Sequence, residues 1–273
     1  MTIAVIWEED GRQWCAADTR LVAGEQDTPM TEIGSKIYSI PVAASALTAD
    51  AYARAPHFRT QYGFIYAGAV LPAVMTAITA STLLQQLARP GERANPPRFE
   101  EIASFVHRLS RRFMVERRWF GSDGLFSAAL FGWCPYTSRY KIAHIDGRDD
   151  CSTFRVDLSY PSAPESEGEP WLILGSAAPT FLATLADYKA TEPYIRKSLP
   201  RRAIEKMVAD GTDATVGGTT SIGFAHQHGF EVVFSLEPVV IGEPAARRIF
   251  NGLDLDTDVG HVGQYFVALN GQA

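Results

Sequence analysis

The chain opens with two apolar blocks separated by a polar turn. Residues 3–7 are all apolar, Glu8-Glu9-Asp10-Gly11 is polar, and residues 13–17 form a second strand-like run. Asp-Gly between two apolar runs is typical of a β-hairpin, so we expect the chain to begin with one. A third strand is predicted at residues 37–40, where Pro41 would end it.

Further along, strand-like and helix-like patterns alternate. Helices are expected at about 69–87, 99–116, 179–189 and 193–209, and further strands at 63–66, 125–134, 140–145, 153–158, 171–174, 218–225 and 230–236. The tail from about residue 243 has a short helical piece followed by mixed polar residues. This order predicts an α+β protein, a four-layer α-β-β-α sandwich of two stacked antiparallel sheets flanked by helices.

One long uncharged stretch permits two interpretations. Residues 63–84 contain no charged side chain, and 22 such positions are long enough to span a bilayer. The alternative is a short strand followed by a buried helix. Pro72 suits the first turn of a helix, and several Thr, Ser and Gln residues make the stretch only mildly apolar. We therefore favour the buried helix and predict no membrane segment.

Composition narrows the class of function. A hydrophobic fraction of 46% and a charged fraction of 21% are ordinary for a soluble globular protein. The net charge of −6 leaves no basic excess to neutralise phosphates, so we predict no nucleic-acid partner. The three cysteines are widely separated and indicate neither a zinc site nor a disulfide framework. No secretory signal is visible, and a cytoplasmic location is expected.

The start of the chain also carries candidate chemistry. Thr2 precedes the first strand, Asp18 follows the second, and Lys36 comes soon after. If Met1 is removed, the freed α-amine of Thr2, with an ordinary pKa of about 7.7–8.0, can act as the base for its own hydroxyl. The Lys36 ammonium would favour the neutral amine by repulsion, and Asp18 would keep Lys36 charged and aimed. The alternative is an ordinary surface ion pair.

These residues resemble a known family, the catalytic β-subunits of proteasome-type threonine peptidases, which are N-terminal nucleophile hydrolases and include HslV, Anbu and bacterial proteasome homologues. The family's order is a processed Thr, an Ala-Ala-Asp-Ser-Arg-like strand end, an Ala-Gly loop and a Lys-Val/Ile strand. The matching segments here are Thr2, Ala16-Ala17-Asp18-Thr19-Arg20, Ala23-Gly24 and Lys36-Ile37. A competing alignment places Met1 first and Thr2 second.

Three later segments extend the resemblance over nearly the whole chain. They are Tyr66-Ala67-Gly68-Ala69, Leu172-Ile173-Leu174-Gly175-Ser176 and Asp213-Ala214-Thr215-Val216-Gly217-Gly218. Val216 departs from the family pattern, which has a serine there, and weakens the implied proton relay. Relative to the family, residues 42–60 form an insertion, and the sequence leaves open whether it is helical and whether it borders a substrate cleft or a subunit surface. The tail from about 243 is an extension of a single domain spanning 1–273.

The resemblance implies specific roles. The Gly68 amide would be the oxyanion donor, Ser176 would help relay the proton, and Asp213 would orient the amine and hydroxyl of Thr2. From the residues alone, Gly68 is equally a strand-to-helix turn, Ser176 a helix cap and Asp213 a turn residue. The catalytic set implied by the resemblance is Thr2, Asp18, Lys36, Gly68, Ser176 and Asp213.

The resemblance therefore implies a threonine-type endopeptidase. It would act on peptides or unfolded proteins inside a self-assembled homo-oligomeric ring or related assembly, with an ATP-dependent unfoldase as the family's kind of partner. No cofactor or metal is implied. Two alternatives remain: a non-catalytic assembly or binding subunit, favoured by Val216, and an N-terminal nucleophile amidase acting on a small amide.

Two further motifs suggest metal binding but lack complete ligand sets. His226-x-His228 flanks a predicted hairpin turn with no clustered third ligand. The series Asp254-x-Asp256-x-Asp258 resembles a calcium loop, but Gly260 is one place late and Tyr265 stands where the final Glu belongs. We predict a polar loop there and no metal site.

Overall fold

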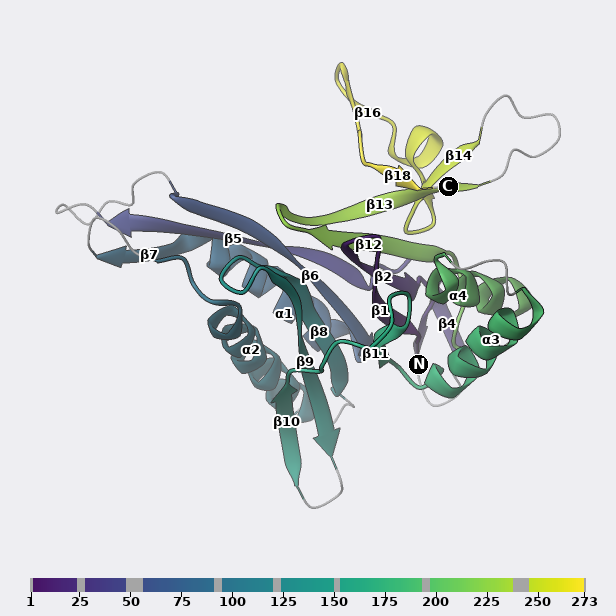
Figure 1. Cartoon of the computed structure of the whole chain (residues 1–273), viewed down its shortest axis with the longest axis horizontal. Coiled ribbons are helices and arrows are strands. Elements are labelled where there is room, and N and C mark those ends of the chain that lie inside the picture. Colours follow the sequence, from purple (N-terminus) through teal and green to yellow (C-terminus); the bar gives the residue numbers. More distant parts are fainter. Residues whose placement is uncertain are drawn as a thin grey trace. The chain divides into compact units, whose positions relative to one another are not determined.

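The computed structural model of the chain describes residues 2–23, 28–47, 56–90, 95–119, 124–149, 153–192, 197–237 and 246–272. Its internal contacts divide the chain into two compact units (Figure 1). The first unit comprises Met1–Ile37, Ala163–Phe224 and Glu231–Ala273, and the second comprises Tyr38–Ser162 and Ala225–Phe230. The chain combines antiparallel sheets with four α-helices among its described residues, so the α+β class is confirmed.

The predicted N-terminal hairpin is confirmed. Strand β1 (Ala4–Glu9) pairs with β2 (Arg12–Asp18) in antiparallel register, with Ala4 opposite Ala17 and Glu9 opposite Arg12. The turn residues Asp10 and Gly11 both have positive φ, 49° and 67°, as a two-residue hairpin turn of the I′ type requires. This register sets the last residue of β2 beside the residues that precede β1.

The hairpin belongs to a larger sheet in the order β11-β1-β2-β12-β13-β14-β15. The other strands are β11 (Pro170–Leu174), β12 (Thr220–His226), β13 (Gly229–Glu237), β14 (Arg247–Phe250) and β15 (Leu253–Asp254), and β18 (Gly271–Gln272) also pairs with β13. A separate two-stranded sheet pairs β3 (Leu21–Ala23) with β4 (Thr28–Thr31).

Helices α3 (Ala178–Thr191) and α4 (Leu199–Asp210) lie side by side in the first unit (Figure 1). They share one hydrophobic core with the β1–β2 hairpin. Ile3, Val5 and Trp7 from the hairpin segment pack in it, together with Phe181 of α3 and Met207 of α4. The all-apolar run 3–7 is therefore explained by burial of the whole segment.

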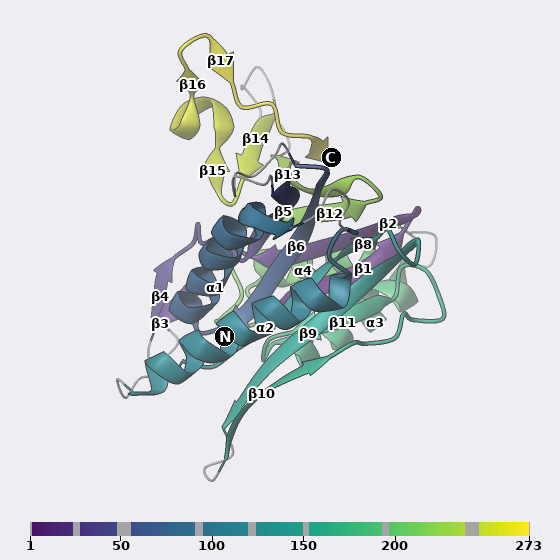
Figure 2. The ribbon, with the colours of Figure 1, turned by 90° about the vertical axis from the view of Figure 1, so that its left-hand side faces the viewer.

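The second unit is built on a sheet in the order β10-β9-β8-β6-β5-β7. These strands are β5 (Ile37–Leu47), β6 (Phe58–Gly68), β7 (Leu87–Pro90), β8 (Phe126–Cys134), β9 (Arg139–Asp149) and β10 (Phe154–Ser159). Helices α1 (Val70–Leu83) and α2 (Phe99–Trp119) lie side by side against one face (Figure 2). Tyr62, Phe64 and Phe126 are fully buried in this core.

Two predicted boundaries in the second unit are wrong. Pro41 does not end its strand, because β5 continues to Leu47. The parallel pairing of β5 with β7 begins only at Ala44, so the N–H that Pro41 lacks is not needed on that side. The predicted helix 69–87 ends at Leu83 and is followed by a 3₁₀ turn, η1 (Leu84–Gln86), and by β7. Pairing with β5 overrides local helical preference there.

The interpretation of residues 63–84 as a strand followed by a helix is confirmed. β6 runs to Gly68, and α1 begins at Val70 with Pro72 buried in its first turn. Only one face of α1 is buried, since Leu71 and Ile78 are more than half exposed. Among the described residues, no helix is both long and apolar enough to cross a membrane.

The remaining differences lie at the insertion, at α4 and in the tail. Residues 42–47 and 58–60 are extended parts of β5 and β6, and residues 48–55 lie outside the described chain. Helix α4 starts at Leu199 instead of 193, and residues 193–196 also lie outside the described chain. The short helical piece expected in the tail is a π-helical turn, η2 (Leu255–Val259), followed by the hairpin of β16 (His261–Val262) and β17 (Tyr265–Phe266).

Candidate active site

The hairpin register brings the chain start to the end of β2. Asp18 donates its backbone N–H to the Ile3 carbonyl at 3.3 Å, and the Asp18 carboxylate accepts the Ile3 N–H at 3.1 Å. The segment carrying Lys36 is held next to β2 because Gly34 donates its N–H to the Thr19 carbonyl at 2.8 Å. Two backbone hydrogen bonds, at Asp18 and at Gly34, thus bring together Thr2 and Lys36, which are 34 positions apart in the sequence.

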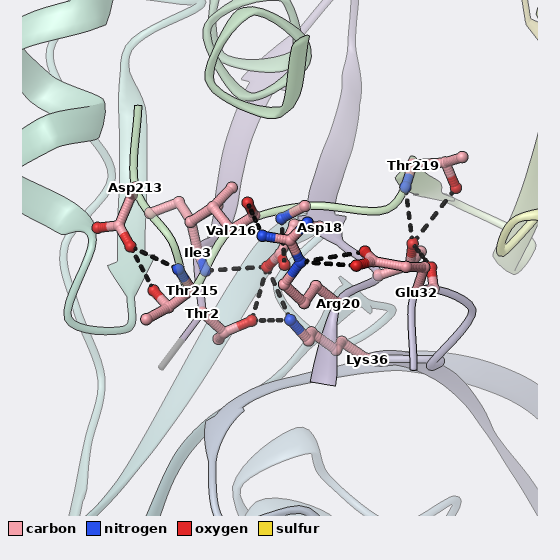
Figure 3. A network of polar contacts seen from close by, with 12 residues as sticks. Thr2, Ile3, Asp18, Arg20, Glu32, Lys36, Asp213, Thr215, Val216 and Thr219 are labelled. Carbon is pink, nitrogen blue, oxygen red and sulfur yellow. Dashed lines mark hydrogen bonds and ion pairs between the residues drawn. The ribbon is translucent and has the colours of Figure 1, made fainter. Parts of the chain in front are cut away.

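Thr2, Asp18 and Lys36 form one buried polar cluster (Figure 3). The Thr2 hydroxyl donates to Asp18 Oδ1 at 2.6 Å, and Lys36 Nζ donates to the same oxygen at 2.7 Å. Lys36 Nζ also donates to Thr2 Oγ1. Thr2 is 3% exposed, Asp18 0% and Lys36 2%, so the three groups interact away from bulk solvent.

Burial sets the proton affinity of Lys36. The pKa of the Lys36 ammonium lies below its ordinary value chiefly because burial disfavours the charged form, and the Asp18 carboxylate opposes part of this effect. The Asp18 carboxylate is in turn held by the Thr2 hydroxyl, the Ile3 N–H, Lys36 and the Gly217 N–H, which donates to Oδ2 at 3.2 Å. Four donors compensate for the desolvation of this carboxylate.

A second segment, residues 213–219, packs against the cluster. Arg20 N donates to the Gly217 carbonyl at 3.0 Å, and the Arg20 guanidinium donates to the carbonyls of Ala214 at 2.8 Å and Val216 at 3.3 Å. The Glu32 carboxylate fixes the guanidinium through Nε at 3.0 and 3.1 Å. Arg20 therefore positions the loop that delivers the Gly217 N–H to Asp18.

Sequence reasoning assigned no role to Arg20 or Gly217. A Cβ built on Gly217 would lie 2.2 Å from Arg20 Cζ and 2.4 Å from Nε, so this position needs glycine for the guanidinium to fit. Arg20 could have been found from the sequence, because it ends the Ala-Ala-Asp-Thr-Arg segment that follows the family pattern. Its target lies 194 residues away, beyond the reach of a local pattern.

Asp213 and Val216 occupy this same segment but face different partners. Asp213 Oδ1 accepts the Thr215 N–H at 2.9 Å and the Thr215 hydroxyl at 2.5 Å, which makes an Asx turn. Thr215 is 2% exposed. Val216, where the family has serine, packs in the hydrophobic core of the first unit with 1% exposure. In the described chain, the hydrogen bonds to the Asp213 carboxylate come from Thr215, and the Asp213 carbonyl accepts the Val216 N–H at 3.0 Å.

Ser176 is not part of the buried cluster, and Gly68 belongs to the other unit. Ser176 precedes α3 and is exposed, and the N-cap of α3 is Ala177 with no side-chain cap, so the helix-cap alternative for Ser176 is wrong. Gly68 ends β6 in the second unit, whereas the other five predicted residues belong to the first. Its φ of 108° and a Cβ position 2.8 Å from the Leu125 carbonyl oxygen both require glycine.

The side chains of the two metal-like motifs make local hydrogen bonds and ion pairs. Asp254 accepts the N–H groups of Asp256 and Thr257 and caps η2, and Asp256 pairs with Arg248. His226 Nδ1 accepts the His228 N–H at 3.2 Å. No group of three His, Cys, Asp or Glu side chains among the described residues is placed to hold a metal ion. Cys15 and Cys134 are buried free thiols, and burial raises the pKa of Cys15.

Comparison with known proteins shows that solved structures share the fold of this chain. No family model matches the sequence, and no curated protein matches it. The solved structure of the Anbu (ancestral beta-subunit) protein from Yersinia bercovieri superposes with a TM-score of 0.51 at 13% identity, over 81% of this chain and 80% of that one. The Anbu complex from Pseudomonas aeruginosa, solved as a helical assembly, gives 0.52 at 14% identity, over 89% and 88%. At these identities the likeness concerns the fold alone, which is that of the Anbu structures.

Proposed function

We propose that this chain is a threonine-type hydrolase of the proteasome-like N-terminal nucleophile class, cleaving peptide bonds through Thr2. One observation carries the proposal: the Thr2 hydroxyl is buried in direct contact with both Lys36 Nζ and Asp18 Oδ1. A nucleophile, a cation and an orienting carboxylate in one water-excluded cluster is the arrangement that activates a hydroxyl. A structural threonine needs no buried ammonium beside it.

The proposed reaction begins when Thr2 Oγ attacks the carbonyl carbon of a peptide bond. The hydroxyl proton passes to the α-amine of Thr2, which is free only after Met1 is removed. Lys36, aimed by Asp18, stabilises the developing negative charge on Oγ, and by resemblance the Gly68 amide is assigned to the oxyanion. The C–N bond then breaks, and the leaving amine takes the proton. Water hydrolyses the resulting ester and restores Thr2.

Residues Ser176 and Asp213 keep their proposed relay and orienting roles on the strength of the resemblance alone. Asp213 accepts the Thr215 hydroxyl, and Val216 offers no hydroxyl in place of the serine of the family pattern. The proposal needs no metal or organic cofactor.

The proposed assembly is a homo-oligomer, a ring or a related structure. The Anbu complex from Pseudomonas aeruginosa forms a helical assembly, and the fold is shared. We also propose that the two main sheets stack into the four-layer sandwich, that the chain acts in the cytoplasm on peptides or unfolded proteins, and that any unfoldase partner is ATP-dependent. We likewise propose that the chain is a single domain, with an insertion at 42–60 and an extension from 243.

A non-catalytic assembly subunit is the second candidate. Val216 cannot relay a proton, and Asp213 is engaged by Thr215, so the amine of Thr2 lacks one partner that the family pattern supplies. An N-terminal nucleophile amidase acting on a small amide is the third. It would use the same cluster on a different substrate.

Two measurements test the proposal. The intact mass of the purified native protein should correspond to a chain without Met1. A fluorogenic peptide should be hydrolysed by wild type and not by Thr2→Ala. Thr191→Ala is the matched control, because Thr191 is exposed on α3 and its hydroxyl donates only to its own helix, at Asp187 O. Its activity should equal that of wild type.

The outcomes separate the three candidates. Peptide hydrolysis by Thr2→Ala at the wild-type rate would overturn the nucleophile assignment. A retained Met1 together with no turnover of peptides or small amides would favour the assembly subunit. Turnover of small amides without peptides, lost in Thr2→Ala, would identify the amidase.

A further inference from the structure

The second unit contains a cavity of about 380 Å³ that none of the proposed catalytic residues lines. Its wall is formed by the end of β5, the edge strand β7, residues 95–98 and the first turn of α2. His57, just before β6, and Tyr136, in the turn between β8 and β9, complete it. A volume of this size is within the range of small-molecule sites, about 300–1,000 Å³.

Two arginines give this cavity a positive wall. Arg89 of β7 and Arg98 before α2 are both exposed, and neither lies within ion-pair distance of a carboxylate in the described part of the chain. The nearest acid in the lining is Glu101, whose Oε2 accepts the Arg98 backbone N–H at 2.7 Å. That carboxylate keeps its charge while it accepts the N–H at the start of the helix. The lining therefore sets two guanidinium groups against one carboxylate and has a net positive charge.

The remainder of the wall is mixed: the polar side chains of His57 and Asn95 and one buried hydroxyl lie beside apolar and aromatic surface. Leu87 and Pro97 contribute aliphatic surface. The Tyr136 ring is fixed because its hydroxyl donates to the Pro96 carbonyl at 2.5 Å, and the Arg98 guanidinium lies 5.9 Å from its centre. Ser45 also lines the cavity and is 8% exposed, and no hydrogen bond joins its hydroxyl to another described residue.

We propose that this cavity binds a small organic anion, with its carboxylate or phosphate group on Arg89 and Arg98 and its apolar body against Leu87 and Tyr136. Guanidinium groups bind both head groups through paired N–H donors, which explains why two arginines share one cavity. The Ser45 hydroxyl supplies a further donor at the buried end. The site is independent of Thr2 and of the proposed hydrolase activity.

Calorimetric titration of the full chain at fixed ionic strength tests the assignment. The probes are hexanoate, phenyl phosphate and inorganic phosphate, which separate a carboxylate head, a phosphate head and a head without an apolar body. At least one organic anion should bind saturably and more tightly than inorganic phosphate. Arg98→Gln and Arg89→Gln should each weaken that binding about 10- to 100-fold, the range for losing hydrogen bonds to a charged group.

Two more variants keep the test decisive. Arg111→Gln removes the same charge from an exposed position of α2 outside the cavity and should leave binding unchanged. Ala88→Glu places a carboxylate on the exposed rim and should abolish binding, with an unfolding temperature near that of wild type. The proposal is overturned if no organic anion binds, if inorganic phosphate binds equally well, or if the Arg111 variant weakens binding as much as the Arg98 variant.

Discussion

Lys36 and Lys141 each pair with one carboxylate, but in opposite environments. Lys36 and its partner Asp18 are 2% and 0% exposed at their side chains, whereas Lys141 and Glu100 are 25% and 44% exposed. Burial lowers the pKa of Lys36 despite Asp18. The hydrogen bond to Glu100 raises the pKa of Lys141, and the same bond lowers the pKa of Glu100.

The difference shows which pair is arranged for chemistry. Removing two charges from water costs more free energy than their attraction returns unless further hydrogen bonds satisfy them. Asp18 has those extra donors in Ile3 and Gly217. A buried ammonium with a lowered pKa exchanges protons more readily near neutrality than a surface lysine does. The Lys141–Glu100 pair joins β9 to α2 and needs no such adjustment.

Lys36→Met should have the largest effect. It leaves the Asp18 carboxylate buried without its cation, and breaking such a pair costs about 3–5 kcal/mol of unfolding free energy. Peptide hydrolysis should fall by about 10²–10⁴-fold, the range for a group that assists proton transfer. Urea denaturation and a fluorogenic peptide assay measure the two effects. A variant as stable and active as wild type would remove the contrast between the two lysines.

The pH dependence of the same variant has a defined sign. In the folded state the pKa of Lys36 lies below its ordinary 10.5, so the unfolded chain binds more protons in the interval between the two values. The stability of wild type relative to Lys36→Met should therefore rise as pH increases through that interval towards 10.5. A falling difference would mean that Lys36 is held as a stable ammonium.

Asp18→Asn should have the next largest effect. The amide keeps the shape of the side chain but removes the charge that opposes the desolvation of Lys36, so the pKa of Lys36 should fall further. The loss of charge-assisted hydrogen bonds should cost about 1.5–3 kcal/mol of unfolding free energy. Amine-specific labelling of Lys36, followed by mass spectrometry across pH, measures the shift. An unchanged labelling profile would contradict it.

Gly217→Ala tests whether the hydrogen bonds around Asp18 support the Lys36 site. The added Cβ would meet the Arg20 guanidinium, so Arg20 has to leave the carbonyls of Ala214 and Val216. The loss of these hydrogen bonds to a charged group should cost about 1.5–3 kcal/mol of unfolding free energy, and the site should lose about tenfold in activity as the Gly217 N–H shifts from Asp18. Urea denaturation and the peptide assay measure both losses.

Gly168→Ala is the control for this variant. Its φ of 82° strains an alanine, but the added Cβ would meet no atom within 4 Å, so stability should fall while activity stays at the wild-type level. An equal loss of activity in both variants would mean that general destabilisation, and not displacement of Arg20, is responsible.

The parts of the site that sequence predicted are those fixed by short-range rules. Asp10-Gly11 sets the hairpin turn, and the register of the hairpin then dictates that Asp18 meets the residues before β1. Burial of Lys36 follows from the same register together with one backbone bond at Gly34. The sequence motif, the hairpin turn and the spacing were sufficient to predict that Thr2, Asp18 and Lys36 lie together.

The parts that sequence missed depend on contacts between distant segments. The parallel pairing of Ala44–Leu47 with Leu87–Pro90 turned a predicted helix end into β7, and no local pattern encodes a partner about forty residues away. Arg20 likewise reaches Ala214, which lies 194 residues further along the chain. The Asx turn at Asp213 is by contrast a local contact, and a turn role for Asp213 was the alternative that the residues alone predicted.

Lys141→Met should have the smallest effect, below about 1 kcal/mol at neutral pH, because the pair is partly exposed and water replaces the lost partner. Its pH dependence should oppose that of Lys36. The pKa of Lys141 is raised above 10.5 by Glu100, so its contribution is fully present below 10.5 and is lost as pH rises through the raised value. Urea denaturation of wild type and Lys141→Met at pH 7 and above 10.5 should therefore show a small difference that vanishes at high pH. A loss of peptide hydrolysis in this variant would show that the surface pair also supports the site, and the distinction between the two lysines would fail.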